Sequence, residues 1–129
     1  MADLVVIPAR PSVFDIDAVK ETIAYSRERR KPYAIVLNGA PPKRDNAESP
    51  ITSAARESLE ALKAPVWAGQ ISHRTTYSLS IADGDGAREF DPESQAAAEV
   101  ARLFSAIERS VKAIQGAAPA TNVMHRRAA

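Results

Sequence analysis

Apolar residues gather in three short runs, at residues 4–7, 33–37 and 66–71. Each run is nearly continuous rather than alternating, which is typical of strands that are covered on both faces. The stretches between the runs have helical periodicity, and this alternation predicts βαβ crossovers and a parallel sheet. The sequence therefore predicts an α/β fold with three layers, built on part of a doubly wound parallel sheet.

Two helices are predicted between these strands. The first is expected over about residues 16–30, with Asp15 as its cap and with Val19, Ile23 and Ser26 on one face. The second begins at Ser49-Pro50, because a capping residue followed by proline is a frequent helix start. Its expected inner face is formed by Ile51, Ala55, Leu59 and Leu62.

The last third of the chain is predicted to be helical. A short helix is expected over residues 75–82, closed by the turn Gly84-Asp85-Gly86, and a longer one after Asp91-Pro92. The long helix carries an apolar stripe at Val100, Leu103, Phe104, Ile107, Val111 and Ile114. From Gly116 the composition shifts toward Ala, Pro, Thr and Asn, which predicts one domain over residues 2–115 and a disordered tail over 116–129.

Composition narrows the classes of function. Lys and Arg number 17 against 16 Asp and Glu, so global charge gives no strong attraction to nucleic acid or to an anionic membrane. The absence of cysteine excludes disulfides and thiolate metal sites, and the two histidines lack ligand spacing, so no metal site is expected. The first apolar run is too short for a signal peptide or a membrane span, and a cytoplasmic protein is the simplest expectation.

Three segments carry a resemblance to a known family. They are "ADLVVIPARPSVFDIDAV", "PYAIVLNGAPP" and "GQISHRTTYSLSIADGDGAREFDPESQAAAEVARLF", in this order. Together they resemble the C-terminal half of a ParA-type partition ATPase, of the ParA/MinD group with a deviant Walker A loop. The resemblance covers residues 2 to about 114. It implies half of a P-loop NTPase-like domain and a role in the partitioning of plasmid or chromosomal DNA.

The phosphate-binding parts of that family have no counterpart in this sequence. Its members use ATP and Mg²⁺, held by a glycine-rich loop of the type GGxGK[ST] and by a Walker B aspartate; neither motif occurs here. The chain begins just after the point where the Walker B segment would end. We therefore expect a truncated ATPase-like chain that binds no ATP or Mg²⁺ by itself, and we assign no catalytic residue.

Asn38 is the candidate cofactor-binding residue. It follows a predicted strand, and ligands of open α/β sheets lie at the carboxyl ends of strands. The resemblance implies that its carboxamide contributes to the adenine pocket of the intact fold. The alternative is that Asn38-Gly39 is simply a turn.

Arg74 is the candidate DNA contact. The resemblance places an arginine there, in a region that contributes to nonspecific DNA binding, and an arginine can neutralise a phosphate. The alternative is a surface ion pair. Two further basic groups, at residues 27–31 and at Arg102, Arg109 and Lys112, are interpreted as solvated helix faces with Glu99 and Glu108 as ion-pair partners. Trp67 and Tyr33 are expected in the core, and Asp15 and Asp17 are read as structural residues.

Two other functions stay open. The chain is alternatively a free-standing, non-catalytic interaction module, whose exposed strand edge at residues 4–7 pairs with a second copy or with a full-length ParA-like partner. The third possibility, a small basic DNA-binding protein, is the least favoured because the net charge is only +1.

Overall fold

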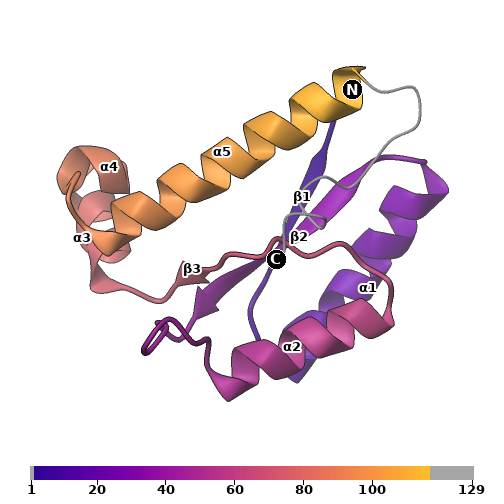
Figure 1. Ribbon diagram of the computed structural model, residues 1–129, viewed down its shortest axis with the longest axis horizontal. Coiled ribbons are helices and arrows are strands. Elements are labelled where there is room, and N and C mark those ends of the chain that lie inside the picture. The colour runs from indigo at the N-terminus through magenta and orange to yellow at the C-terminus, as the bar shows by residue number, and fades with distance from the viewer. Residues whose placement is uncertain (1, 117–129) are drawn as a thin grey trace.

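The computed structural model describes residues 2–116 and has the predicted α/β architecture. The elements follow the order β1 (Val5–Ala9), α1 (Val13–Glu28), β2 (Tyr33–Ala40), α2 (Pro50–Ala61), β3 (Ile71–Ser72), α3 (Thr75–Asp83), α4 (Ala87–Phe90) and α5 (Gln95–Gly116). The strands form a parallel sheet in the order β1-β2-β3. Helices α1 and α2 cover one face of this sheet, and α5 runs across the other (Figure 1). Apart from Gly116, the expected tail lies outside the described residues.

The core is divided by the sheet into a large and a small cluster. Successive side chains of a strand point to opposite faces, so alternate residues of β2 enter the two clusters. Ile35 and Leu37, both fully buried, pack against α1 and α2, whereas Ala34 and Val36 face α5 together with Trp67. Tyr33 and Trp67 are both 6% exposed, which confirms their expected place in the core.

Helix α1 begins earlier than predicted. Its N-cap is Ser12 and not Asp15: the Ser12 hydroxyl accepts a hydrogen bond from the Asp15 N–H at 3.2 Å. Asp15 occupies the first turn, where a carboxylate is favourable, and accepts from the Arg10 N–H at 3.3 Å. Val19, Ile23 and Ser26 form the buried face, as expected.

Helix α2 begins as predicted, with Ser49 as N-cap and Pro50 in the first turn. Its inner face is rotated from the expected one. Ala55 and Leu59 are buried, but Ile51 is 53% exposed and Thr52 is fully buried in its place. Thr52 is held there because its hydroxyl and the Ser49 hydroxyl share a hydrogen bond of 2.9 Å.

The third strand is much shorter than predicted. The chain touches the sheet at Val66, which bridges to Ile35, leaves it, and returns only at β3. Between these points Arg56 of α2 donates to the Trp67 carbonyl at 2.6 Å and to the Gly69 carbonyl at 3.0 Å. Arg56 therefore binds backbone carbonyl groups that, in a continuous strand, would accept hydrogen bonds from a neighbouring strand.

Helix α5 follows Ser94, whose hydroxyl accepts from the Ala97 N–H at 3.0 Å. Its apolar stripe is only partly inward, because Phe104 is 61% exposed while Ala106 and Ser110 are buried. Small side chains at these buried positions let the helix approach the sheet closely. Helix α4 was not predicted, and it packs beside the N-terminal end of α5 (Figure 1).

Candidate functional site

The carboxyl ends of β2 and β3 lie side by side and bring the two candidate residues to one edge of the sheet. Asn38 is in register with Ile71, and Ala40 with Ser72. The His73 N–H then donates to the Ala40 carbonyl at 2.7 Å, which fixes the start of the loop that carries Arg74. Asn38 is exposed at this edge, the position where open parallel sheets bind ligands.

Asn38-Gly39 is not the turn considered from the sequence. Strand β2 continues through Ala40, and the pairing with β3 shifts register between Asn38 and Ala40. Gly39 absorbs this irregularity with φ of +65°, a conformation that glycine adopts without steric cost. The strand therefore extends three residues further than predicted, and Asn38 lies on the ladder itself.

A buried carboxylate organises the loop after β3. Glu99 of α5 is 4% exposed and accepts hydrogen bonds from the Ser72 hydroxyl at 2.5 Å and the Ser72 N–H at 3.2 Å. Arg74 donates from Nε at 3.1 Å and from Nη2 at 3.3 Å, and the Tyr77 hydroxyl donates at 3.1 Å. We call Ser72, Arg74, Tyr77 and Glu99 the Glu99 cluster. It ties α5 to the carboxyl end of the sheet.

The donors of the cluster set the protonation of Glu99. Burial by itself would raise the pKa of this carboxyl, but the hydrogen bonds from Arg74 and Ser72 outweigh burial and hold the pKa below its usual range. Burial and the neighbouring Glu99 charge raise the pKa of the Tyr77 hydroxyl. At neutral pH Glu99 is therefore charged and Tyr77 keeps its proton.

The cluster changes the interpretation of Arg74. The Arg74 side chain is 22% exposed and its guanidinium is paired with a carboxylate, so the charge it offers to a phosphate is largely compensated. Arg74 therefore forms an ion pair, as in the alternative considered from the sequence, although its partner Glu99 is buried rather than on the surface. The interpretation of Glu99 as part of a solvated helix face was wrong, because this side chain points into the protein.

The burial of Glu99 was not predicted, although the helical spacing of the sequence indicates it. Glu99 precedes Leu103 by four residues and Ala106 by seven, which places it on the inward face of the helix. A carboxylate on such a face requires buried donors. Gln70 was also missed: it is 4% exposed and donates to the Pro41 carbonyl at 2.9 Å and to the Ser72 hydroxyl at 2.8 Å.

Among the other basic residues, one is held by hydrogen bonds and three form no ion pair within the described residues. Arg27 is structural, since it donates to the Tyr33 hydroxyl at 2.9 Å and to the Leu62 carbonyl at 2.6 Å. Lys43, Arg102 and Arg109 form no ion pair with any residue in the described range.

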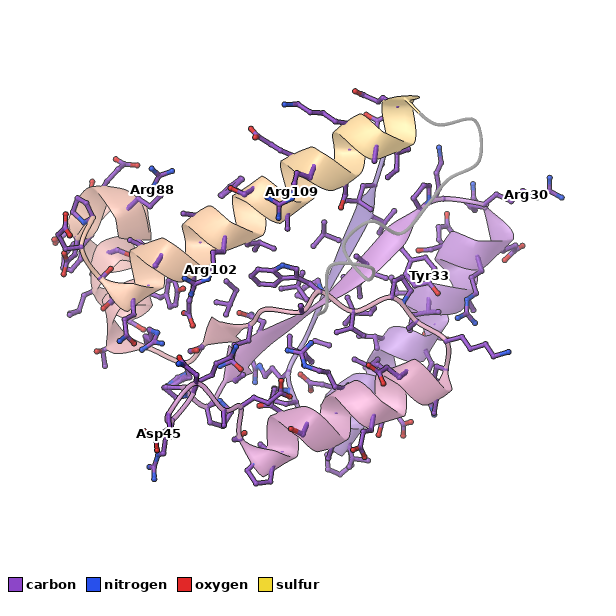
Figure 2. The ribbon with its side chains drawn as sticks, in the orientation of Figure 1. Arg30, Tyr33, Asp45, Arg88, Arg102 and Arg109 are labelled. Atoms are coloured by element: carbon purple, nitrogen blue, oxygen red, sulfur yellow. The ribbon has the colours of Figure 1, made fainter. Side chains whose placement is uncertain are left out.

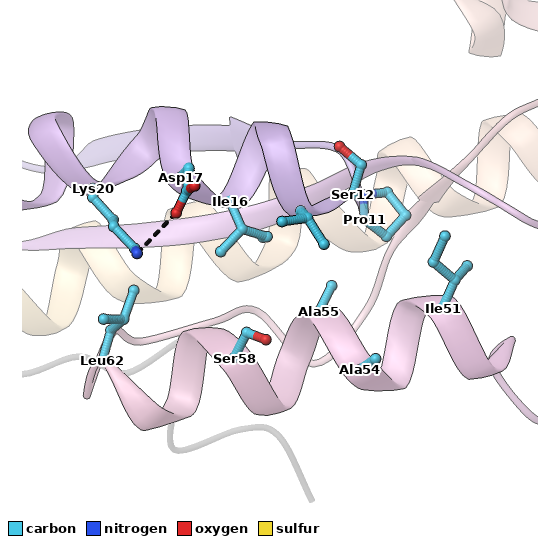
Figure 3. A pocket seen from close by; sticks show the side chains of 11 residues that line it. Pro11, Ser12, Ile16, Asp17, Lys20, Ile51, Ala54, Ala55, Ser58 and Leu62 are labelled. Carbon is cyan, nitrogen blue, oxygen red and sulfur yellow. Dashed lines mark ion pairs between the residues drawn. The ribbon is translucent and has the colours of Figure 1, made fainter.

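An apolar hollow of about 280 Å³ lies between α1 and α2, on the opposite face of the sheet from the Glu99 cluster (Figure 3). Ile16 and Ala55 form part of its walls, and an exposed Asp17–Lys20 ion pair of 2.8 Å lies at its border.

Over residues 2–116, no three His, Asp or Glu side chains gather in a geometry that could hold a metal ion. Within the same residues, no helix is long and apolar enough to cross a membrane.

The chain matches no model of a known protein family and no curated protein sequence. Solved structures do share its fold. The cell division ATPase MinD of Pyrococcus furiosus superimposes with a TM-score of 0.67 over 84% of this chain, at 18% identity. An ATP complex of a McdA variant from Cyanothece gives a TM-score of 0.57 over 89% of this chain, at 12% identity. The fold is thus ParA/MinD-like.

This likeness covers only part of each neighbour. The chain spans 43% of the MinD structure and 42% of the McdA structure, so it is comparable to less than half of either protein. At these identities the comparison concerns the fold alone.

Proposed function

We propose that this chain is the C-terminal portion of a ParA-like ATPase that partitions or positions cellular cargo, plasmid or chromosomal DNA in particular. The shared fold supports this proposal, and the observation that carries it is the place of Asn38 at the carboxyl end of the central strand. In this proposal Asn38 contacts the adenine of ATP. The phosphates and Mg²⁺ are held by residues outside these 129 positions.

Nucleotide titrations test both parts of this proposal. With ATP and Mg²⁺, we expect the isolated chain to show no turnover and no binding tighter than about 1 mM, because it lacks the glycine-rich loop and the Walker B aspartate that hold the triphosphate and Mg²⁺. Micromolar binding with phosphate release would contradict the requirement for an external loop. With adenosine alone, we expect NMR shifts at the Asn38 carboxamide that are lost in Asn38→Ala. They should be kept in the control Gln115→Ala, which removes an exposed amide in the last turn of α5. The absence of such shifts would remove the adenine role.

We further propose that Arg74 contributes weakly to nonspecific DNA binding. Nη1 of its guanidinium is not engaged by Glu99 within the described residues and can still donate to a phosphate. Binding of a random duplex, followed by fluorescence anisotropy between about 50 mM and 200 mM salt, measures this contribution. We expect Arg74→Gln to reduce the salt slope by at most about 1. An unchanged slope would contradict the contact.

A second candidate function is a free-standing interaction module that pairs through the edge of β1. The Val5 N–H donates to the Pro32 carbonyl, so in this parallel ladder Val5, Ile7 and Ala9 face β2. The polar backbone groups of Leu4 and Val6 and the Pro8 carbonyl therefore face away from the sheet. Val6 is also 36% exposed, which leaves an apolar side chain beside this edge.

Light scattering over a range of concentrations tests whether the chain associates through the edge of β1. If it pairs, the chain dimerises or binds a ParA-like partner, and Val6→Pro weakens the association because the outward N–H is lost. Val6→Ala keeps this N–H and serves as the control. A monomer at every concentration that also fails to bind a ParA-like partner would exclude this function.

A further inference from the structure

A polar hollow of about 470 Å³ lies between the loop after β2 and the N-terminal half of α5. Its volume falls in the range of small-molecule sites. Figure 2 shows Arg102 on α5 and Asp45 in the loop that follows β2. Asp45 and Asn46 both have positive φ and form the tip of a tight turn, closed by reciprocal backbone hydrogen bonds between Arg44 and Ala47. The hollow is distinct from the Asn38 position, because Asn38 does not line it.

The walls of this hollow are polar throughout. Every lining side chain larger than alanine is charged or carries an amide; these residues are Lys43, Asp45, Asn46, Gln70, Arg74, Gln95, Glu99 and Arg102. No aromatic ring or branched aliphatic side chain is available to cover a nucleobase, a lipid tail or an apolar peptide. Carboxylates and amides are instead suited to a ligand that has several hydroxyl groups.

The charges in the hollow favour an anionic group. Arg74 and Glu99 compensate each other, whereas Lys43 and Arg102 form no ion pair with any residue of the described range. Asp45 is the remaining acid of the lining and lies at the tip of the turn. A phosphate or carboxylate placed near Lys43 and Arg102 therefore meets two uncompensated cations.

Gln70 borders this hollow and has one unpaired polar atom. Its Nε2 donates to the Pro41 carbonyl, which can only accept, so Nε2 and not Oε1 faces Pro41. The other end, Oε1, is buried and accepts no hydrogen bond from any residue between 2 and 116. A buried oxygen without a donor is unfavourable. Because Oε1 itself has almost no accessible surface, a ligand hydroxyl in the hollow pairs with it only when the Gln70 side chain turns toward the ligand.

We propose that this hollow is a binding site for a small, hydroxyl-rich anion of the sugar phosphate class. Lys43 and Arg102 bind the phosphate, ligand hydroxyl groups donate to the Asp45 carboxylate, and the Gln70 side chain turns toward the hollow so that its Oε1 accepts a further hydroxyl. The Glu99 cluster holds the floor of the site, because Ser72 links Gln70 to the buried carboxylate.

Titration of the full chain with glucose 6-phosphate and with ribose 5-phosphate, followed by NMR, tests the site. We expect saturable shifts at Gln70 and Arg102, with a dissociation constant below about 1 mM for at least one of them. The corresponding free sugar and inorganic phosphate should each bind at least tenfold more weakly. Equal binding of inorganic phosphate would reduce the site to an anion patch, and no saturation by either sugar phosphate up to about 10 mM would overturn the proposal.

Two exposed basic residues on one helix provide a pair of variants. Arg102→Gln should weaken sugar phosphate binding at least tenfold, because Arg102 lines the hollow. Lys112→Gln removes the same charge about three turns further along α5, outside the hollows that Lys43 and Arg102 line, and should leave the affinity within about twofold. Equal losses in the two variants would mean general electrostatic attraction and would also overturn the proposal. Both side chains are exposed, so neither change is expected to unfold the protein.

Discussion

At the scale of single residues, Gly69 shows how closely the backbone approaches a buried ring. A Cβ atom at this position would lie 2.6 Å from Cζ2 and 2.7 Å from Cη2 of the Trp67 indole. Trp67 is 6% exposed and cannot move without disturbing the cluster under α5. We expect Gly69→Ala to lower the free energy of unfolding by about 1–3 kcal/mol in urea titrations.

The control for this change is Gly116→Ala, where a Cβ would meet nothing within 4 Å. That variant should stay within about 0.5 kcal/mol of the parent chain. Similar effects of the two substitutions would mean that the contact with Trp67 does not restrict Gly69.

The depressed pKa of Glu99 gives stability a dependence on pH. A carboxyl whose pKa is lower in the folded than in the unfolded chain stabilises above the unfolded value, here 4.5, and this contribution is lost as pH falls through the folded value. The urea midpoint of the parent chain should therefore decrease from pH 7 toward about pH 3. In Glu99→Gln the decrease should be smaller, because the glutamine does not titrate.

Removal of the Glu99 side chain measures how much Glu99 contributes to the free energy of unfolding at neutral pH. Glu99→Ala leaves Arg74 and the Ser72 N–H without their buried acceptor, and we expect a loss of about 3 kcal/mol. The exposed Glu108→Ala is the matched control on the same helix and should change the midpoint little. A parallel pH profile for the parent chain and Glu99→Gln would show that Glu99 does not carry the acid dependence.

At the scale of elements, the start of α2 depends on one hydroxyl. Ser49 accepts from the Thr52 N–H at 3.3 Å and bonds to the Thr52 hydroxyl, which is fully buried. Ser49→Ala should therefore destabilise the protein by about 1–2 kcal/mol, measured by urea unfolding. Ser58→Ala, at an exposed position of the same helix, should change stability by less than about 0.5 kcal/mol.

At the scale of the whole molecule, the two faces of the sheet are unequally covered. The larger cluster joins β1 and β2 to α1 and α2, whereas the cluster under α5 contains only four buried residues. In native-state hydrogen exchange we expect the amides of Ile35 and Leu37 to be the most protected, and those in the last turns of α5 to exchange through openings of lower free energy. A single opening free energy for both regions would show that the two layers unfold as one unit.

The sequence by itself determined the class of fold and the starts of α2 and α3. Continuous apolar runs required strands covered on both faces, and Ser49-Pro50 marked a helix start through local backbone chemistry. Only the tertiary structure decided where the third strand lies, because Arg56 reaches across from α2 to the carbonyls of Trp67 and Gly69. The same holds for the Glu99 cluster and the polar hollow, which join loops and a helix that are far apart in the sequence. Periodicity describes one element at a time, whereas a buried carboxylate and its donors are matched between elements.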